Sequence, residues 1–436
     1  MMNKQMLIAA AFALGSSAPA MATTHIDMMF PAPVDGKLTV KMNQLIKDFN
    51  QMHSDIKVRP IFTGSYDTTK QKAEAAAKAG RPPALVIMSA NYTTDLAINH
   101  EILPMSELFQ YGPDKNATAF LKENFFKAVQ KNAMFNGKAY AMPFQNSTPI
   151  LYFNKDLFKK AGIQGAPQTW KELREDARKL TSRQNGQWGI MLPSTNNDYC
   201  AWVLSSLVHA NGGNFNNPDY PGEVYYNSVT TIGALDLYKD LIFKDKSMPE
   251  GVLDSKQIDA QFLSGKLGMT ILSTGSLTFI RNHAKSFHLG VAMLPKKFRR
   301  GVIIGGASLV SFKGISDAQK KAAYQLLRYL TSPKINGEWS RFTGYFAPRK
   351  KAYDLPKMKQ FLAKHPSAKV AFEQLKYAYP WYSTYETVAV RQAMENQVAA
   401  LISNKDLSPA EVAATAQKNA DKILAPYQRE TALNQQ

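Results

Sequence analysis

Apolar and polar residues alternate along the first third of the chain in two distinct rhythms. Short, mostly apolar runs at residues 26–30, 56–62 and 84–88 have the length and character of β-strands. Between them, residues 38–51 and 68–78 carry apolar side chains at the spacing of an amphipathic helix. Strands that alternate with helices in this way indicate an α/β unit built on a mainly parallel sheet.

The same rhythm resumes after two adjoining extended segments between residues 139 and 153. The pattern then predicts helices at 155–161, 170–180 and 200–210, and strands at 188–192 and 267–272, with a helix opening at Gly275. The last third is mostly helical, with helices at 317–331, 388–403 and 408–426. We find no internal repeat and no low-complexity linker. A chain of 436 residues, 45% of them apolar, exceeds one compact core, so we predict two lobes that share an interface.

The first residues have the order of a secretory signal. Lys4 precedes an apolar run at residues 6–14 that is too short to span a bilayer, and small residues follow up to Ala22. We expect cleavage near Ala22, with Thr23 as the first mature residue, and export to the periplasm if the source is a bacterium. No cysteine lies near this position, so we expect no lipid anchor.

The formal charge of +19 raises the question of a polyanionic partner. Removal of Lys4 with the signal leaves 52 basic and 34 acidic residues, or +18. The basic residues are dispersed, and no zinc-finger or RNA-binding signature accompanies them. We therefore interpret the excess as a solvated surface and expect no nucleic-acid partner.

Sequence motifs for catalysis are missing. The seven histidines form no metal-binding pair, and the single cysteine, Cys200, has no histidine close to it in sequence. The G-x-S-x-G elbow and the glycine-rich nucleotide loops do not occur. We expect no metal, no cofactor and no enzymatic activity, although a secreted enzyme with catalytic residues distant in sequence stays an alternative.

Three segments place hydroxyls and backbone amides at turns, where an anion can be held. They are residues 145–149, 273–276 and 303–308. Ordinary helix capping is the commoner explanation for any one of them, and three together weaken it only modestly.

Longer motifs give a resemblance to a known family. Residues 151–163 (LYFNKDLFKKAGI) and 167–173 (PQTWKEL), with 262–269 and 326–333, resemble the extracellular solute-binding proteins of ABC importers. Within that group, the serine and glycine segments at 147–149, 273–277, 303–308 and 343–345 resemble the branch that binds glycerol-3-phosphate. The resemblance covers essentially the whole mature chain.

The resemblance implies a two-lobe α/β fold of the type II periplasmic binding proteins, with the ligand cleft between lobes joined by hinge crossings. We expect one lobe to comprise 23–146 and 274–338 and the other to comprise 147–273 and 339–436. The crossings are expected near residues 144–149, 273–276 and 337–345. It also implies a monomer that delivers a small phosphorylated solute to permease subunits in the inner membrane, coupled to a cytoplasmic ATPase.

The resemblance also implies the ligand-binding residues. They are Tyr66, Ser147, Ser273, Gly306, Tyr345 and Arg391, with Tyr199 and Trp202 as further possible members. A guanidinium offers two charge-assisted hydrogen bonds to a phosphate, and serine hydroxyls add short ones. Glycine lets the backbone approach the ligand, and tyrosine covers a small polyol with a flat ring that ends in a donor.

One position departs from the family pattern. Where the family has a glutamate for the glycerol hydroxyls, this chain has Ala90. One hypothesis is that the ligand is a glycerophosphodiester or another phosphorylated polyol, because a buried carboxylate would be costly beside a phosphodiester. The equally weighted alternative is that the ligand is glycerol-3-phosphate and that Ser89 or Asn91 accepts its hydroxyl hydrogen bonds in place of the glutamate, directly or through water. A protein of the same fold that binds a neutral oligosaccharide or another polyol remains the alternative, and it would be indifferent to Arg391.

Overall fold

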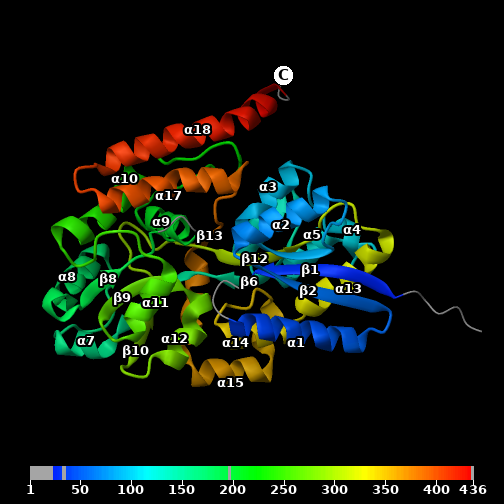
Figure 1. Cartoon of the computed structure of the whole chain (residues 1–436). Coiled ribbons are helices and arrows are strands. Elements are labelled where there is room, and N and C mark those ends of the chain that lie inside the picture. The colour runs from blue at the N-terminus through cyan, green and yellow to red at the C-terminus, as the bar shows by residue number, and fades with distance from the viewer. Residues whose placement is uncertain (1–22, 32–35, 195–197, 434–436) are drawn as a thin grey trace, which may run out of the picture.

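The computed structural model describes residues 23–31, 36–194 and 198–433, so the predicted signal at 1–22 lies outside the described residues. The chain forms two α/β lobes side by side, each around its own sheet and its own hydrophobic core (Figure 1). No helix in these ranges combines the length and the apolar character needed to cross a bilayer.

The first lobe is built on a five-stranded sheet in the order β2-β1-β3-β12-β6. Its strands are β1 (Thr24–Pro31), β2 (Ile56–Gly64), β3 (Leu85–Ser89), β6 (Met142–Ser147) and β12 (Gly305–Val310). The first three pair in parallel, as predicted, but β12 runs antiparallel to both β3 and β6. Strand β12 is antiparallel to β6 because the chain re-enters the first lobe at the same end of the sheet at which β6 leaves it.

Helices cover this sheet, and the larger ones are α1 (Gly36–Met52), α2 (Tyr66–Lys78), α13 (Asp317–Leu330) and α14 (Pro333–Thr343). Of these, α1, α2 and α13 lie where the apolar spacing predicts them, whereas α14 was not predicted. Shorter elements are α3 (Thr93–Ile98), α4 (Ser106–Phe109), α5 (Ala117–Asn124), α6 (Lys127–Gln130), η2 (Lys131–Ala133), β4 (Met134–Phe135) and β5 (Lys138–Ala139). The buried face of α1 carries apolar residues three to four positions apart, which places it against the sheet.

The second lobe holds a four-stranded sheet in the order β10-β7-β9-β8. Its strands are β7 (Pro149–Asn154), β8 (Trp188–Met191), β9 (Leu267–Ser273) and β10 (Leu289–Ala292). Its helices include α7 (Lys155–Lys160), α8 (Trp170–Leu180), α9 (Tyr199–Ala210), α10 (Val229–Lys239), α11 (Ser255–Leu263) and α12 (Leu277–His283). The C-terminal helices α17 (Thr387–Ser403) and α18 (Pro409–Leu433) pack on this lobe as well (Figure 1).

Two segments pack on the other side of the predicted lobe boundaries. Strand β10 pairs with β7 in the second sheet, although it falls within 274–338. Gly290 permits this pairing, because a Cβ there would lie 2.2 Å from the Phe153 ring. Conversely, Trp339 and Phe346 lie in the core of the first lobe, beyond residue 338.

Helix α18 continues past Pro426, where the sequence predicts its end. A proline in a helix interior removes one backbone hydrogen bond and crowds the preceding turn. Packing outweighs that cost here, because the Tyr427 ring stacks on Tyr385 at 5.5 Å and contacts Tyr220 at 5.8 Å.

Candidate functional site

The two sheets meet where β6 passes into β7. Pro149, the first residue of β7, pairs with Ser273, the last residue of β9. Two hydrogen bonds join the neighbouring backbones: the Thr274 amide donates to the Thr148 carbonyl at 3.1 Å, and the Thr148 amide donates to the Thr274 hydroxyl at 3.3 Å. Ser147 and Ser273 therefore lie on adjoining chain passages between the lobes.

Strand β12 brings Gly306 to the same edge. It lies between β6, which ends at Ser147, and β3, which ends just before Ala90. Gly306 has a φ of +90°, and a Cβ on it would lie 2.1 Å from the carbonyl oxygen of Gln145. The close approach of β6 thus already requires glycine at this position, independently of any ligand.

Tyr66 and Tyr345 come together at this edge from opposite ends of the chain. Tyr66 opens α2, and its hydroxyl accepts a hydrogen bond of 2.9 Å from the Gln145 side chain. The Tyr345 ring passes over Gly275, where a Cβ would lie 2.7 Å from Cζ. Burial raises the pKa of Tyr345 to about 12 and that of Tyr66 further, and the two phenols also interact with each other. Both phenols are therefore protonated donors at neutral pH.

Tyr199 and Trp202 form the wall on the second-lobe side. Both lie in the first turn of α9, with their rings edge to face at 5.5 Å. The Tyr199 hydroxyl accepts from the Ser273 amide, and the Trp202 indole donates to the Ile303 carbonyl at 3.1 Å. Trp202 packs against Gly305, where a Cβ would lie 2.6 Å from the ring.

Arg391 is fully buried at the interface of the lobes. Its guanidinium donates to Asp67 at 2.6 Å, to the Tyr92 hydroxyl at 3.0 Å and to Glu395 at 3.4 Å, and Tyr92 in turn donates to Asp67. From the residue pattern alone, without the resemblance, Arg391 would be predicted as a solvated charge on a helix surface, and the structure instead buries it. The pair with Asp67 links α17 of the second lobe to α2 of the first.

Carboxylates outnumber the guanidinium in this region. Asp198 lies within electrostatic range of Arg391, and its burial, with a further contribution from Asp67, raises its pKa to about 6. Burial raises the pKa of Glu395 strongly as well. Burial alone would lower the pKa of Arg391, but Tyr92 and the three carboxylates raise it well above its usual value. We call Arg391, Asp67, Tyr92, Glu395 and Asp198 the Arg391 cluster.

The segment around Ala90 contains no carboxylate before Asp95. Ala90 is buried, and the nearest acid along the chain, Asp95, pairs with Lys70 at 3.2 Å. The Ser89 hydroxyl donates to Asn91 at 2.8 Å, which leaves the Asn91 side-chain NH₂ buried with no partner among the described residues. Asn91 therefore keeps a donor for a group that is not part of the chain.

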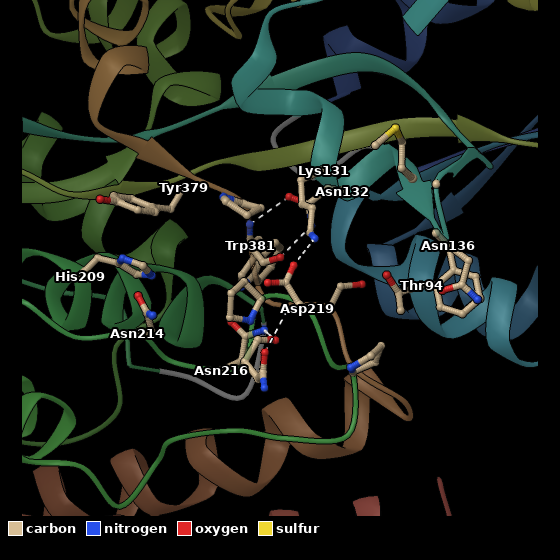
Figure 2. A pocket seen from close by; sticks show the side chains of 18 residues that line it. Thr94, Lys131, Asn132, Asn136, His209, Asn214, Asn216, Asp219, Tyr379 and Trp381 are labelled. Carbon is tan, nitrogen blue, oxygen red and sulfur yellow. Dashed lines mark hydrogen bonds and ion pairs between the residues drawn. The ribbon is translucent and has the colours of Figure 1, made fainter. Parts of the chain in front are cut away.

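A cavity of about 390 Å³ opens between the lobes beside this edge (Figure 2). Residues of α3, η2 and β4 line it from the first lobe, and residues of α9, of the loop after it and of the segment 379–383 line it from the other side. Its polar lining is rich in asparagines, namely Asn132, Asn136, Asn214, Asn216 and Asn217. We call it the amide cavity. It adjoins the predicted site through Trp381, whose ring lies 6.4 Å from that of Trp202.

The nine positions named from the sequence thus lie along one edge between the lobes, although that they hold a ligand stays a prediction. Residue reasoning missed the groups that contact them, above all Asp67, Tyr92, Gln145 and Glu395. Of these four residues only Glu395 could be predicted from the sequence, because it lies four positions after Arg391 on a predicted helix, the spacing of a helical ion pair. The lining of the amide cavity was also missed, since it is assembled from segments far apart in sequence.

Comparison with known proteins gives three kinds of match. Residues 44–369 match the family model of the bacterial extracellular solute-binding proteins. The sn-glycerol-3-phosphate-binding periplasmic protein UgpB of Yersinia enterocolitica is 33% identical over 383 residues, which cover 84% of each chain. UgpB of Pectobacterium atrosepticum is 31% identical over 380 residues, which cover 84% of this chain and 82% of that one.

Solved structures agree on the fold. UgpB of Mycobacterium tuberculosis in complex with glycerophosphocholine superposes with a TM-score of 0.79 at 24% identity, covering 93% of this chain and all of that one. A maltose-bound MalE3 of T. maritima gives 0.78 at 22% identity, covering 92% of this chain and all of that one. These similarities confirm the predicted two-lobe α/β fold class.

Proposed function

The chain belongs to the bacterial extracellular solute-binding proteins, and from that premise we propose that it captures sn-glycerol-3-phosphate or a glycerophosphodiester between its lobes for an ABC importer. The observation that carries the proposal is the convergence of Arg391, two serines and two tyrosines at one interlobe edge. The UgpB relatives are named as sn-glycerol-3-phosphate-binding proteins, and this chain is similar to them over most of their length.

The ligand's phosphate belongs beside Arg391 and the serine hydroxyls. A guanidinium has five N–H donors, and three atoms of this one already serve Asp67, Tyr92 and Glu395. Asp67 is the partner that can leave, because about a quarter of its side chain is exposed whereas Glu395 is fully buried. An incoming phosphate therefore replaces the Asp67 carboxylate on the guanidinium.

A diester suits this neighbourhood better than a monoester. A phosphodiester carries one negative charge and a phosphomonoester close to two at neutral pH, so the diester meets less repulsion from Asp67, Asp198 and Glu395. The absence of a carboxylate at Ala90 agrees with a ligand that carries a second substituent there.

Binding serves transport without any bond being made or broken. A ligand that contacts both lobes stabilises the closed form by its different affinities for the two states. The closed monomer then delivers its solute to the permease subunits in the inner membrane, which a cytoplasmic ATPase drives. We place this cycle in the periplasm, after cleavage near Ala22.

The lobe boundaries follow the two cores. We keep 23–146 in the first lobe and 147–273 in the second, and we move the return passage from residue 274 to between Ile303 and Ile304, which lie in different cores. The last passage then lies between Ala371, in the first core, and Trp381, in the second.

A ligand panel with an Arg391→Ala variant tests the proposal. We expect calorimetry to show binding of glycerol-3-phosphate or glycerophosphocholine and none of maltose, and we expect the variant to lose about ten- to a hundred-fold in affinity. Phosphate-ligand binding that is unchanged in Arg391→Ala would remove this residue from the site.

The second candidate is a neutral oligosaccharide or polyol. It is favoured by the full pairing of Arg391 within the protein and by the asparagines and aromatic rings of the amide cavity. Maltose binding that is indifferent to Arg391→Ala, with no binding of phosphate ligands, would establish this candidate in place of the first.

A further inference from the structure

The amide cavity lies directly beside the position where the family glutamate is missing. Thr94, which lines it, is four residues after Ala90. Ser383, which also lines it, donates its hydroxyl to the Asn91 carbonyl. The second substituent of a phosphodiester, if it extends from the predicted phosphate position past Ala90, therefore enters this cavity.

The lining is polar and mostly uncharged. Figure 2 shows Asn132, Asn214 and Asn216 around the opening, with Thr94 on the opposite side. Asn132, Asn216 and Asn217 already form hydrogen bonds within the protein. An asparagine side chain both donates and accepts, so Asn214, with the Thr94 hydroxyl across the cavity, matches hydroxyl groups, which do the same. Trp381 adds a flat ring, and its indole N–H is buried with no partner in the described part of the chain.

The charged groups at the cavity offset one another. Lys131 pairs with Asp219 at 2.8 Å across the opening, so the cavity gains no net charge from them. Burial, and next the nearby Arg299, lower the pKa of His209 to about 4, so its ring is neutral at physiological pH. Among the described lining residues the only carboxylate is that of Asp219, and because it is paired with Lys131, a cationic substituent finds no free opposite charge here.

The aromatic rings do not form a cage for a cation. The Tyr379 ring already stacks on His209 at 4.4 Å and lies 5.3 Å from the Arg299 guanidinium. A quaternary ammonium needs several free aromatic faces, and a second cation beside Arg299 would be repelled. A choline headgroup is therefore a poor fit.

The volume suits a small polyol. At about 390 Å³ the cavity lies near the lower end of the range of about 300–1,000 Å³ that is typical of small-molecule sites. That space accommodates a glycerol unit or a single six-carbon ring with its hydroxyls.

We propose that the amide cavity is a subsite for an uncharged polyhydroxylated substituent, so that the ligand is a phosphodiester between glycerol and a second polyol. This inference rests on the proposed function, since it assigns the second half of the ligand whose phosphate Arg391 holds. Asn214 and Thr94 bind the hydroxyls, and Trp381 covers the carbon skeleton.

Calorimetry with four probes tests the subsite: glycerol-3-phosphate, glycerophosphocholine, glycerophosphoglycerol and glycerophosphoinositol. We expect at least one polyol diester to bind about ten-fold more tightly than glycerophosphocholine. A Thr94→Val/Asn214→Leu variant removes two polar contacts, so this preference disappears while the affinity for glycerol-3-phosphate stays as in the wild type. Asn43→Leu, on the exposed face of α1, is the matched control and keeps the preference.

The outcomes separate the two proposals. Tighter binding of glycerophosphocholine than of either polyol diester overturns the subsite and leaves the proposed function standing. The same holds if the double variant keeps the wild-type preference. If no phosphate ligand binds the wild-type protein, the proposed function fails and the subsite fails with it. The comparison among wild-type affinities does not depend on how the variants fold.

Discussion

The Arg391 cluster and the amide cavity both lie between the lobes, yet the first is filled by its own side chains and the second is open. In the cluster, every donor atom of the guanidinium already has a partner within the protein. In the cavity, polar side chains face a space that a ligand can enter. A ligand must displace a carboxylate in one region and only water in the other. Charge in the cluster therefore governs affinity, and hydroxyl geometry in the cavity governs the choice among anions.

The largest expected effect is on stability, from Arg391→Met. Removing a buried charge from its partners leaves Glu395 and Asp67 uncompensated, so we expect the free energy of unfolding to fall by about 3–5 kcal/mol in chemical denaturation. Glu395→Gln in the same chain should recover part of the loss. A stability equal to that of the wild type would show that the cluster tolerates its carboxylates without the arginine.

A smaller effect is expected on affinity from Asp67→Asn. The variant keeps the shape of the side chain but removes the charge that competes with the ligand for Arg391. We expect the affinity for glycerophosphocholine to rise about ten-fold by calorimetry, the size of one charge-assisted contact. Asp55→Asn, at an exposed turn, is the control. Weaker binding in Asp67→Asn would mean that this carboxylate contacts the ligand favourably.

A pH dependence should follow from Asp198. Its pKa is raised from 3.8 to about 6, so the folded protein binds its proton more tightly than the unfolded chain. The stability that this proton contributes is complete below about pH 4 and is lost as the pH rises through 6. Binding of a diester, whose charge is constant over this range, should likewise tighten as the pH falls from 7 to 5.

Asp198→Asn isolates this contribution from that of Glu395, which also titrates. The difference between the wild type and this variant, followed in unfolding and calorimetry from pH 3 to pH 8, should be largest above pH 6 and disappear below about pH 4. A difference that is constant over the whole range would contradict the assignment.

The smallest effect is expected at the mouth of the amide cavity. Lys131 and Asp219 are half to mostly exposed, and exposed pairs contribute about 0–1 kcal/mol. We expect Lys131→Met/Asp219→Asn to unfold at nearly the wild-type denaturant concentration and to keep the preference among diesters. A large loss of stability would show that this pair holds the lobes together, as the Arg391 cluster does.

Local pattern was sufficient where one face of an element is buried. The spacing of apolar residues predicted α1 and the first three strands closely, because α1 and β2 turn one side to the core and β3 is a short apolar run buried throughout. Pairing partners were harder, since the direction of β12 depends on where the chain re-enters the sheet. Strand β10 was not predicted from the sequence, because its four residues give no signal that β7 is their pairing partner.

The candidate site was predictable only in part. Its serines and glycines stand in turns that the residues themselves mark, but Arg391 and the two tyrosines were found through the family resemblance. Asp67 is 324 positions away from Arg391, so no local pattern connects them. The burial of Arg391 could not be foreseen either, because α17 shows little contrast between its faces and its core side includes both Arg391 and Glu395.

The placement of β12 between β3 and β6 has a consequence for how the chain folds. The five-stranded sheet is incomplete until residue 310 has been synthesised, and by then all four strands of the second sheet have been synthesised. Contacts of such long sequence separation form slowly. The first sheet is therefore incomplete until about seven-tenths of the chain has been made, and the strand that completes it also carries Gly306 into place. Completion of the sheet and placement of Gly306 are one event.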